Sequence, residues 1–382
     1  MATTVNLAVE NRDPVETLKG FLRRLLQKEA ASALLVSEHL PMKNAVMPAL
    51  VSDPEKLAGA DPLAPAFPLN GARILSRLSR KQSGAMLAAV LRPCEIRAFV
   101  ELVKLKQGSM EEVLLIGMDC LGAFGNNDYR SFAEGSENGT STLRFYRKVL
   151  GAGDELWQGF DLSPACKSCE HPVADSADIT IGLLGNDIWE SISVIANSER
   201  GEKALKKLEL PEGTPPEKRK EAVSRLISER TAYRDRMFDE TGAAVSDIEK
   251  LMGYLGNCVN CYNCRVACPV CYCRECVFTT DVFDHEPVQY FRWAKRKGMI
   301  KMPTDTVFYH MTRLAHMSTA CIGCGQCSNA CPNGVPVMEL FRTIAHATQK
   351  AFSYSAGSSL EEAPPLSVFR EREFSEVTGG RD

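Results

Sequence analysis

The sequence has little of what would place the chain in a membrane or on nucleic acid. Its longest apolar runs, such as AMLAAVL and VLLIG, are far shorter than the roughly 20 residues that a membrane-spanning helix needs. The net charge is -3 over 382 residues, so no basic excess favours nucleic acid or an anionic membrane surface as a partner. The N-terminal MATTVNLAVENRD has no basic region followed by an apolar core, so we expect no signal peptide.

Several familiar motifs are also missing. No Gly-x-Gly-x-x-Gly segment follows a predicted strand, so a Rossmann-type dinucleotide site has no support. Neither a Walker motif nor a nucleophile elbow occurs, and the six histidines show no metal-ligand spacing. The sequence therefore leaves any catalytic residues unidentified.

Cysteine, in contrast, is abundant. There are 15 cysteines, and 11 of them lie between Cys258 and Cys331. An odd total, tight spacing and the expected lack of an export signal favour metal ligation over disulfides. We therefore expect a cytoplasmic, metal-binding protein.

Two segments share the pattern C-x2-C-x2-C-x3-C-P. The first motif is CVNCYNCRVACP and the second motif is CIGCGQCSNACP. In this pattern three closely spaced thiolates bind one cubane cluster, and the fourth cysteine ligates the other cluster. The pattern predicts two [4Fe–4S] clusters, one held by Cys258, Cys261, Cys264 and Cys331, the other by Cys268, Cys321, Cys324 and Cys327.

Small residues in the second motif favour this interpretation. Gly323, Gly325 and Ala330 let the backbone approach a cluster and donate N–H groups to sulfur. A zinc-stabilised binding module is the rival hypothesis, but zinc sites use pairs of C-x2-C instead of a triplet followed by x3-C-P.

Three further cysteines follow the first motif, Cys271, Cys273 and Cys276. They predict a third site in this region if a fourth ligand is available, for which His285 and His316 are the candidates. The alternatives are packing thiols, or thiols that exchange into one of the two clusters.

The N-terminal half contains a strand, helix and strand in succession. Residues 85–91 and 113–118 are continuous apolar runs, and residues 94–107 have helical spacing. This order predicts a βαβ unit with parallel strands, which end at the same edge of a sheet.

Cys94 and Cys120 each follow one of these strands, at the edge where open α/β sheets bind ligands. Cys166 and Cys169 form a C-x2-C pair that can complete a four-thiolate site. We therefore predict another [4Fe–4S] cluster here; the alternative is that Cys94 and Cys120 are ordinary buried thiols.

The composition divides the chain into four parts. We expect an α/β domain that binds flavin and an Fe–S cluster, a helical linker, an α+β bacterial-ferredoxin-like 2[4Fe–4S] domain and a flexible tail. The predicted boundaries are 1–200, 201–250, 251–352 and 353–382. The tail is assigned from its Ser, Glu, Gly and Pro content.

Three segments together carry a resemblance to a known family: RPCEIRAFVELVKLKQ, GMDC and ACKSCEHPVADSADITIGLLG. Over roughly residues 80–200 the chain resembles the beta-subunit family of coenzyme F420 hydrogenases and dehydrogenases, including formate dehydrogenase beta subunits. The segment FYHMTRLAHMSTACIGCGQCSNACP is similar to the family variant that is fused to a dicluster ferredoxin domain.

The resemblance implies FAD in the N-terminal domain beside a four-cysteine cluster, and hydride exchange with a soluble carrier. Cys94, Cys120, Cys166 and Cys169 match the family's cluster cysteines. Gly182, Gly185 and Asn186 match a glycine-containing turn near the flavin ring. The sequence departs from the F420-reducing members in two places, LPMKNAVMPALV and the turn leading to Ile188-Trp189.

The leading hypothesis is an iron–sulfur flavoprotein subunit of a formate dehydrogenase or hydrogenase complex. It would exchange electrons between a catalytic partner and an F420-type deazaflavin, NAD(P) or ferredoxin. The alternative is a pure electron relay between a dehydrogenase and a heterodisulfide-reductase-like complex, without substrate chemistry of its own.

Overall fold

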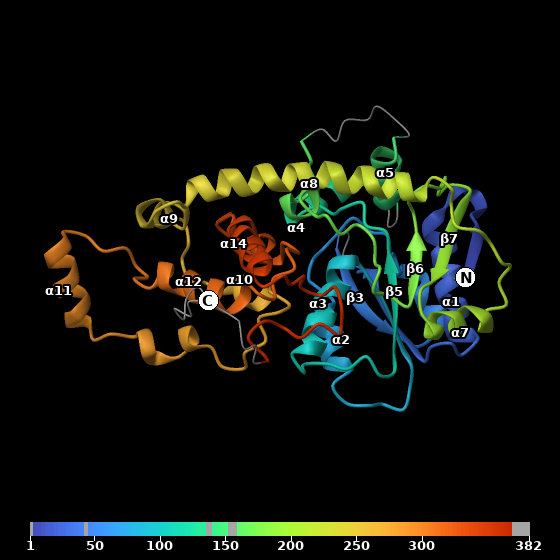
Figure 1. The fold of residues 1–382 in the computed structure, drawn as a ribbon, viewed down its shortest axis with the longest axis horizontal. Helices are drawn as coiled ribbons and strands as arrows, with labels where there is room; N and C mark the ends of the chain where they lie inside the picture. Colours follow the sequence, from blue (N-terminus) through green and yellow to red (C-terminus); the bar gives the residue numbers. More distant parts are fainter. Residues whose placement is uncertain (1–2, 42–44, 135–139, 152–158, 369–382) are drawn as a thin grey trace, which may run out of the picture.

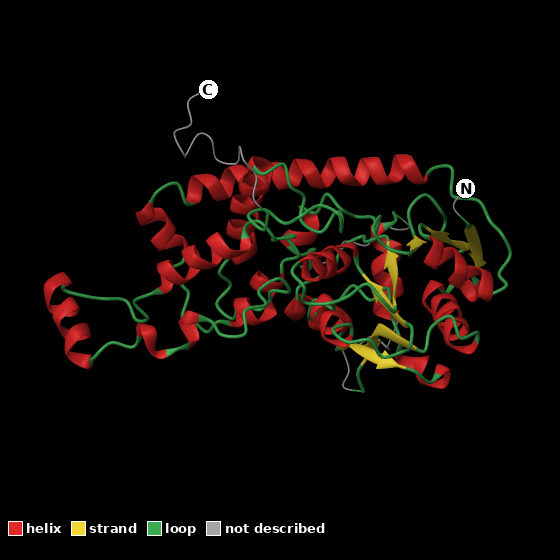
Figure 2. Ribbon diagram, turned by 60° about the horizontal axis from the view of Figure 1, so that its bottom comes forward, coloured by secondary structure: helices red, strands yellow, loops and turns green. Residues whose placement is uncertain are grey.

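The first half of the chain is built on a mixed seven-stranded sheet (Figures 1 and 2). The computed structural model describes residues 3–41, 45–134, 140–151 and 159–368. The strand order is β1-β7-β6-β5-β4-β2-β3. The strands are β1 (Thr4–Ala8), β2 (Ala33–His39), β3 (Val46–Val51), β4 (Leu87–Leu91), β5 (Val113–Met118), β6 (Ile179–Gly182) and β7 (Ser191–Ala196). Strands β2, β4, β5 and β6 pair in parallel, and the edge pairs β2–β3, β6–β7 and β1–β7 are antiparallel.

The predicted βαβ unit is confirmed as β4, α3 (Pro93–Lys104) and β5, with β4 and β5 adjacent in the sheet. Both strands are buried on both faces. In β4, Ala88 and Val90 enter the core on one side of the sheet, and Ala89 and Leu91 enter the core on the other. This explains the continuous apolar runs, because a strand covered on both faces needs no polar positions.

Helices cover both faces of the sheet. α1 (Pro14–Gln27), α4 (Asn126–Ala133), α5 (Thr140–Val149) and α7 (Glu199–Lys207) pack against one face. α2 (Ala72–Leu78) and α3 cover the other face. The N-terminal part is therefore the α/β domain that the sequence predicts.

A single long helix, α8 (Arg219–Ala244), runs from the sheet to the cysteine-rich part of the molecule (Figure 1). Around Tyr233 and Met237, in its second half, it contacts both α6 (Pro164–Lys167) and α14 (Val337–Ala351). Its buried residues are Arg230, Met237 and Thr241. No described helix combines the length and the apolar composition needed to cross a membrane.

The prediction of an α+β ferredoxin domain is wrong, because no described residue after Glu212 lies in a strand. The helices are α9 (Ile248–Tyr254), α10 (Asn263–Ala267), α11 (Pro287–Lys297), α12 (Thr306–Met317), α13 (Gln326–Asn329) and α14. The physical reason is the period of the apolar residues. Val337, Phe341 and Ala345 recur at helical spacing and are buried on one side of α14.

The start of the predicted flexible tail is anchored instead. Tyr354 and Ala356 are buried against the α3 side of the sheet. The Tyr354 hydroxyl donates to Glu101 Oε1 at 2.5 Å, and the Gly357 N–H donates to the same oxygen at 2.6 Å. One aromatic ring and one buried carboxylate therefore fix a segment whose composition suggests disorder; residues 369–382 of the predicted tail lie outside the described residues.

We expect Glu101→Ala to release this segment. Glu101 is fully buried, and Lys104 Nζ lies 2.7 Å from Glu101 Oε1 with its side chain 3% exposed. Removing the carboxylate leaves a buried ammonium without its partner, which should lower the free energy of unfolding by about 3 kcal/mol. Limited proteolysis should then cut within residues 353–368. The exposed Glu111→Ala is the control, and equal protease resistance of both variants would contradict the assignment.

Candidate metal centres

The two cysteine motifs fold into loops of the same backbone geometry. The second residue after the first cysteine of each motif has a positive φ, 50° at Asn260 and 70° at Gly323. The residue directly after the second cysteine also has a positive φ in each loop, 60° at Tyr262 and 79° at Gly325. Each loop then enters a short helix, α10 or α13, and these helices pack on each other. The repeated sequence pattern therefore corresponds to a repeated structure.

This geometry turns backbone N–H groups toward sulfur. The Asn260 N–H donates to Cys258 Sγ at 3.5 Å, and the Gly323 N–H makes the equivalent bond to Cys321. The Val335 N–H donates to Cys331 Sγ at 3.4 Å. Amide donors directed at sulfur stabilise thiolates and bound iron–sulfur clusters, as the small residues of the second motif predict.

The fourth cysteine of the first motif lies with the second motif. Burial raises the pKa of Cys327 well above its usual range, and nearby Cys268, Cys324 and Cys321 raise it further. Burial likewise raises the pKa of Cys258, and its thiol neighbours are Cys264 and Cys331. Cys268 thus lies among the thiols of the second motif, and Cys331 lies near Cys258 and Cys264 of the first motif, while Cys261 is exposed.

Single metal ions and cubane clusters require different spacings of the same thiols. A zinc site needs its ligands around one ion, at Zn–S distances of about 2.3 Å. In the described part of the chain, no three His, Cys, Asp or Glu side chains converge in this way. Each cysteine of a cubane binds a different iron, so its thiols lie farther apart. Bound metal also removes the protons that burial and mutual repulsion hold on these thiols.

Helix α12 supplies three further groups to the first motif. The Arg313 guanidinium donates to Cys264 Sγ at 3.1 Å, and the Tyr309 hydroxyl lies 3.4 Å from the same sulfur. His310 Nε2 lies 3.3 Å from Cys258 Sγ. Burial, with Arg313 and Lys301 nearby, lowers the pKa of His310 to about 4, so the neutral ring faces the thiol. The sequence analysis missed these residues, although their helical spacing in FYHMTRLAHM puts them on neighbouring faces of one helix.

The four N-terminal cysteines also lie together, at the predicted edge of the sheet. Cys94 is in the first turn of α3, Cys120 follows β5, and Cys166 is on α6. Burial and Glu95 raise the pKa of Cys94, and Cys120 and Cys169 raise it further. Burial and Cys120 raise the pKa of Cys166. These thiols form a third four-cysteine group, drawn from separate segments of the domain.

The N-terminal group lies directly beside the second motif. Cys324 is among the thiols that raise the pKa of Cys94. A Cβ atom at Gly325 would come within 2.4 Å of Ala165 Cβ, so α6 and this loop are in close contact. The side chains of Gln326 and Asn329 both donate to the Phe67 carbonyl oxygen, at 2.8 and 2.9 Å. The sheet and the ferredoxin-type loops therefore form one continuous unit.

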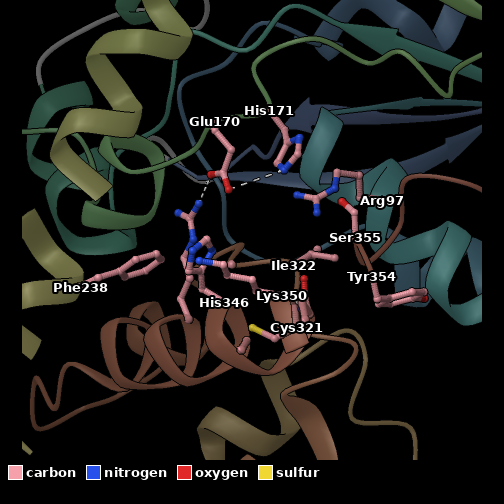
Figure 3. A pocket seen from close by; sticks show the side chains of 14 residues that line it. Arg97, Glu170, His171, Phe238, Cys321, Ile322, His346, Lys350, Tyr354 and Ser355 are labelled. Atoms are coloured by element: carbon pink, nitrogen blue, oxygen red, sulfur yellow. Dashed lines mark hydrogen bonds and ion pairs between the residues drawn. The ribbon is translucent and has the colours of Figure 1, made fainter. Parts of the chain in front are cut away.

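A pocket of about 250 Å³ lies next to this junction (Figure 3). Arg97 and Arg342 line it, and Arg342 pairs with Glu170. Burial raises the pKa of Cys321, whereas the Gly323 N–H, Arg342 and Arg97 act in the opposite direction. The two arginines therefore place positive charge near the Cys321 thiol, which favours its thiolate form.

The structure does not bring Cys271, Cys273 and Cys276 to either predicted fourth ligand. Burial and Cys268 raise the pKa of Cys271 to about 11, whereas Cys273 is exposed and Cys276 lies near Tyr262. His285 packs against Tyr290 and Trp293, with ring-centroid distances of 5.7 and 5.0 Å. The side chain of His316 is exposed on α12.

The glycine turn predicted to face a flavin is covered by the start of α8. Gly185 has a φ of 84°, and a Cβ there would lie 2.4 Å from Arg219 N and 2.5 Å from Arg219 Cα. A Cβ at Gly182 would lie 3.1 Å from Arg219 Nη1. The Asn186 amide donates to Ser193 Oγ at 2.7 Å. The three residues are therefore packed against protein, and they do not fit a flavin ring in this arrangement.

Asp119 fixes this packing. Its Oδ2 accepts from the Leu183 and Leu184 N–H groups at 2.8 and 3.0 Å, and its carboxylate forms an ion pair with Arg219. Asp119 is fully buried. The sequence analysis missed this pair, although an acidic residue directly after a buried strand in GMDC is a signal for it.

Comparisons with known proteins match two separate parts of the chain. Residues 84–212 match the family model for the C-terminal part of the coenzyme F420 hydrogenase/dehydrogenase beta subunit, and residues 316–337 match the 4Fe-4S binding domain. The chain is 26% identical over 305 residues to the F420-dependent formate dehydrogenase subunit beta of Methanocaldococcus jannaschii, covering 73% of this chain and 76% of the relative. It is 26% identical over 308 residues to the F420-dependent formate dehydrogenase 1 subunit beta of Methanococcus maripaludis, covering 74% and 75%.

Among solved structures, the xenon-derivatised F420-reducing [NiFe] hydrogenase complex from Methanosarcina barkeri contains a chain that is 14% identical, with a TM-score of 0.43. That match covers 65% of this chain and 94% of the other. The sequence matches confirm the predicted resemblance: residues 84–212 are similar to the coenzyme F420 hydrogenase/dehydrogenase beta-subunit family, and residues 316–337 match a 4Fe-4S binding domain.

Proposed function

We propose that the chain is an electron-transfer subunit of an oxidoreductase complex, of the kind that contains formate dehydrogenase beta subunits. The observation that carries the proposal is the succession of three four-cysteine groups across one continuous unit. The groups are Cys258, Cys261, Cys264 and Cys331; Cys268, Cys321, Cys324 and Cys327; and Cys94, Cys120, Cys166 and Cys169.

The protein's own residues link these groups. When bound, a [4Fe–4S] cluster supplies one-electron transfer. Cys264 and Cys268 lie at opposite ends of α10, and the proposal assigns them to different groups, so one short helix joins the first group to the second. Cys94 and Cys324 join the second group to the third. The chain therefore offers one route from α10 to the edge of the sheet.

The oxidation of formate or hydrogen is assigned to a partner. The sequence has no residue pattern typical of a molybdenum or nickel site. Two relatives carry the name of a formate dehydrogenase subunit, and such a subunit works beside others. We infer that a catalytic subunit of formate dehydrogenase or hydrogenase exchanges electrons with this chain.

The names of these relatives also support a second candidate function, in which a flavin in this chain reduces an F420-type deazaflavin. NAD(P) or ferredoxin are other carriers that would fit this candidate. The packing of Arg219 on Gly185 argues against it, because the turn expected beside the flavin is filled. We therefore favour the relay function, with the soluble carrier or a heterodisulfide-reductase-like subunit bound elsewhere in the complex.

Cofactor analysis of anaerobically purified full-length protein tests this proposal. We expect about 12 irons per chain, at four per cubane, and no stoichiometric flavin. Cys120→Ser should lose up to about four of these irons, because it removes one ligand of the N-terminal group. Cys273→Ser is the matched control and should keep the full iron content.

Two results would overturn the assignment. A colourless, iron-free but folded protein would end the electron-transfer proposal. One flavin per chain, with reduction by reduced F420, NADH or NADPH, would establish the second candidate function instead.

Tyr309→Phe tests the role of α12. The Tyr309 hydroxyl can donate to Cys264 Sγ, and this donation should favour the more negative, reduced state of the first group. Losing a bond worth about 1 kcal/mol should lower the reduction potential of that centre by roughly 40 mV, measured by redox titration with EPR detection. Tyr254→Phe is the control, since its hydroxyl donates to the Pro336 carbonyl oxygen instead of to sulfur. Equal potentials in both variants would exclude this role for Tyr309.

A further inference from the structure

Exposed apolar side chains are concentrated in one part of the chain. Of 20 large apolar residues exposed in the described structure, 13 lie between residues 248 and 311. They are Ile248, Met252, Val259, Val266, Tyr272, Val277, Val282, Val288, Phe291, Met299, Met302, Phe308 and Met311. Such a concentration marks an interaction surface, since exposed apolar residues are otherwise scattered singly.

The centre of this region is an arm, residues 277–305, that includes α11. Figure 1 shows α11 at the far end of the molecule, apart from the other helices. None of its residues is buried, and Phe291 is 74% exposed. A helix of 11 residues is marginal in water by itself, so we expect another surface to cover it.

An apolar groove of about 610 Å³ lies between this arm and α9. Met252, Trp293, Met299 and Ile300 line it, and Met299 is 80% exposed. Apolar anchors in a groove of this kind accept side chains of a docking protein segment.

The groove has a cationic rim formed by Arg296, Lys297 and Lys301. Arg292 and Lys295 add to this charge from the same helix. Within the described residues, none of these five cations forms an ion pair with a carboxylate. The rim therefore favours a partner that brings Asp and Glu side chains.

The groove is continuous with the first cysteine motif. Lys301 Nζ donates to the Gly256 carbonyl oxygen at 2.7 Å, two residues before Cys258. Cys261 in the same motif is exposed. A protein bound in the groove would thus lie next to the first four-cysteine group.

We propose that the arm and the groove dock the redox partner protein, through a segment with apolar anchors flanked by acidic residues. This inference rests on the proposed electron-transfer function. A second copy of this chain is disfavoured, because a twofold contact would bring the cationic rim against itself. An anionic membrane surface is disfavoured because Asp305 also lines the groove.

Photo-cross-linking in the native complex tests the proposal. Full-length protein would be produced in its own host, with benzoylphenylalanine in place of Phe291 or, as a control, in place of Leu50. Leu50 is 54% exposed, but it lies on β3 in the sheet. We expect cross-linking from position 291 to a polypeptide with its own redox centre, at a peptide that contains Asp or Glu, and none from position 50.

Substitutions provide the quantitative test. The Phe291→Asp/Met299→Asp double variant should weaken association with the cross-linked partner by at least roughly tenfold, as expected for the loss of interface anchors. Lys295→Glu/Arg296→Glu should slow association and reduce its dependence on ionic strength. Leu50→Asp should leave both unchanged.

Measuring the iron content of every variant separates a loss of docking from a loss of the proposed electron-transfer function. Full iron with lost association supports docking, whereas full iron with unchanged association overturns docking but leaves the electron-transfer function intact. Cross-linking to a second copy of this chain, or sedimentation of the wild type but not of the double variant with phosphatidylserine vesicles, would also overturn the proposed partner.

Discussion

Several thiols close together in a protein interior cannot all ionise, and this constraint governs the molecule. Burial and like charge raise the pKa values of Cys94, Cys258 and Cys327. Bound iron would relieve both effects, because it brings positive charge and replaces the protons. The protein adds smaller contributions from Arg313 and from amide N–H groups in the two loops. Folding and metal binding are therefore coupled in the proposed holoprotein.

Contacts outside the thiol groups join the two halves of the chain closely, against this repulsion. The N-terminal group and the second motif repel each other as thiolates but share a contact surface through Ala165 and Gly325. The tail returns from α14 to the sheet, where Glu101 receives Tyr354 and Gly357. Arg219 joins α8 to Asp119 at the end of β5. These contacts fix the distances between the cysteine groups, on which the rate of the proposed electron transfer would depend.

Much of this arrangement follows from local sequence patterns. Apolar runs buried on both faces predicted β4 and β5, and the handedness of their connection placed Cys94 and Cys120 at one edge. The spacing of the two motifs predicted loops whose fourth cysteines cross over. The features that the sequence did not predict depend on contacts between distant residues. No pattern near Gly185 shows that Arg219, 34 positions later, will cover it, and the polar tail conceals the anchoring role of Tyr354. The helical form of the ferredoxin-type domain was missed because the motif specifies the loops and leaves the segments between them undetermined.

The loops of the first and second cysteine motifs differ in which residues adopt positive φ angles, and this difference affects their stability. Positive φ angles fall on glycines in the second loop, but on Asn260 and Tyr262 in the first. A left-handed conformation costs a residue with a Cβ roughly 1 kcal/mol or more, although asparagine tolerates it better than tyrosine. The first loop therefore stores backbone strain, and it is also the loop with an exposed cysteine, Cys261. If the proposed clusters are bound, the one in this loop should be the first that oxygen degrades, because it combines a strained backbone with an exposed ligand.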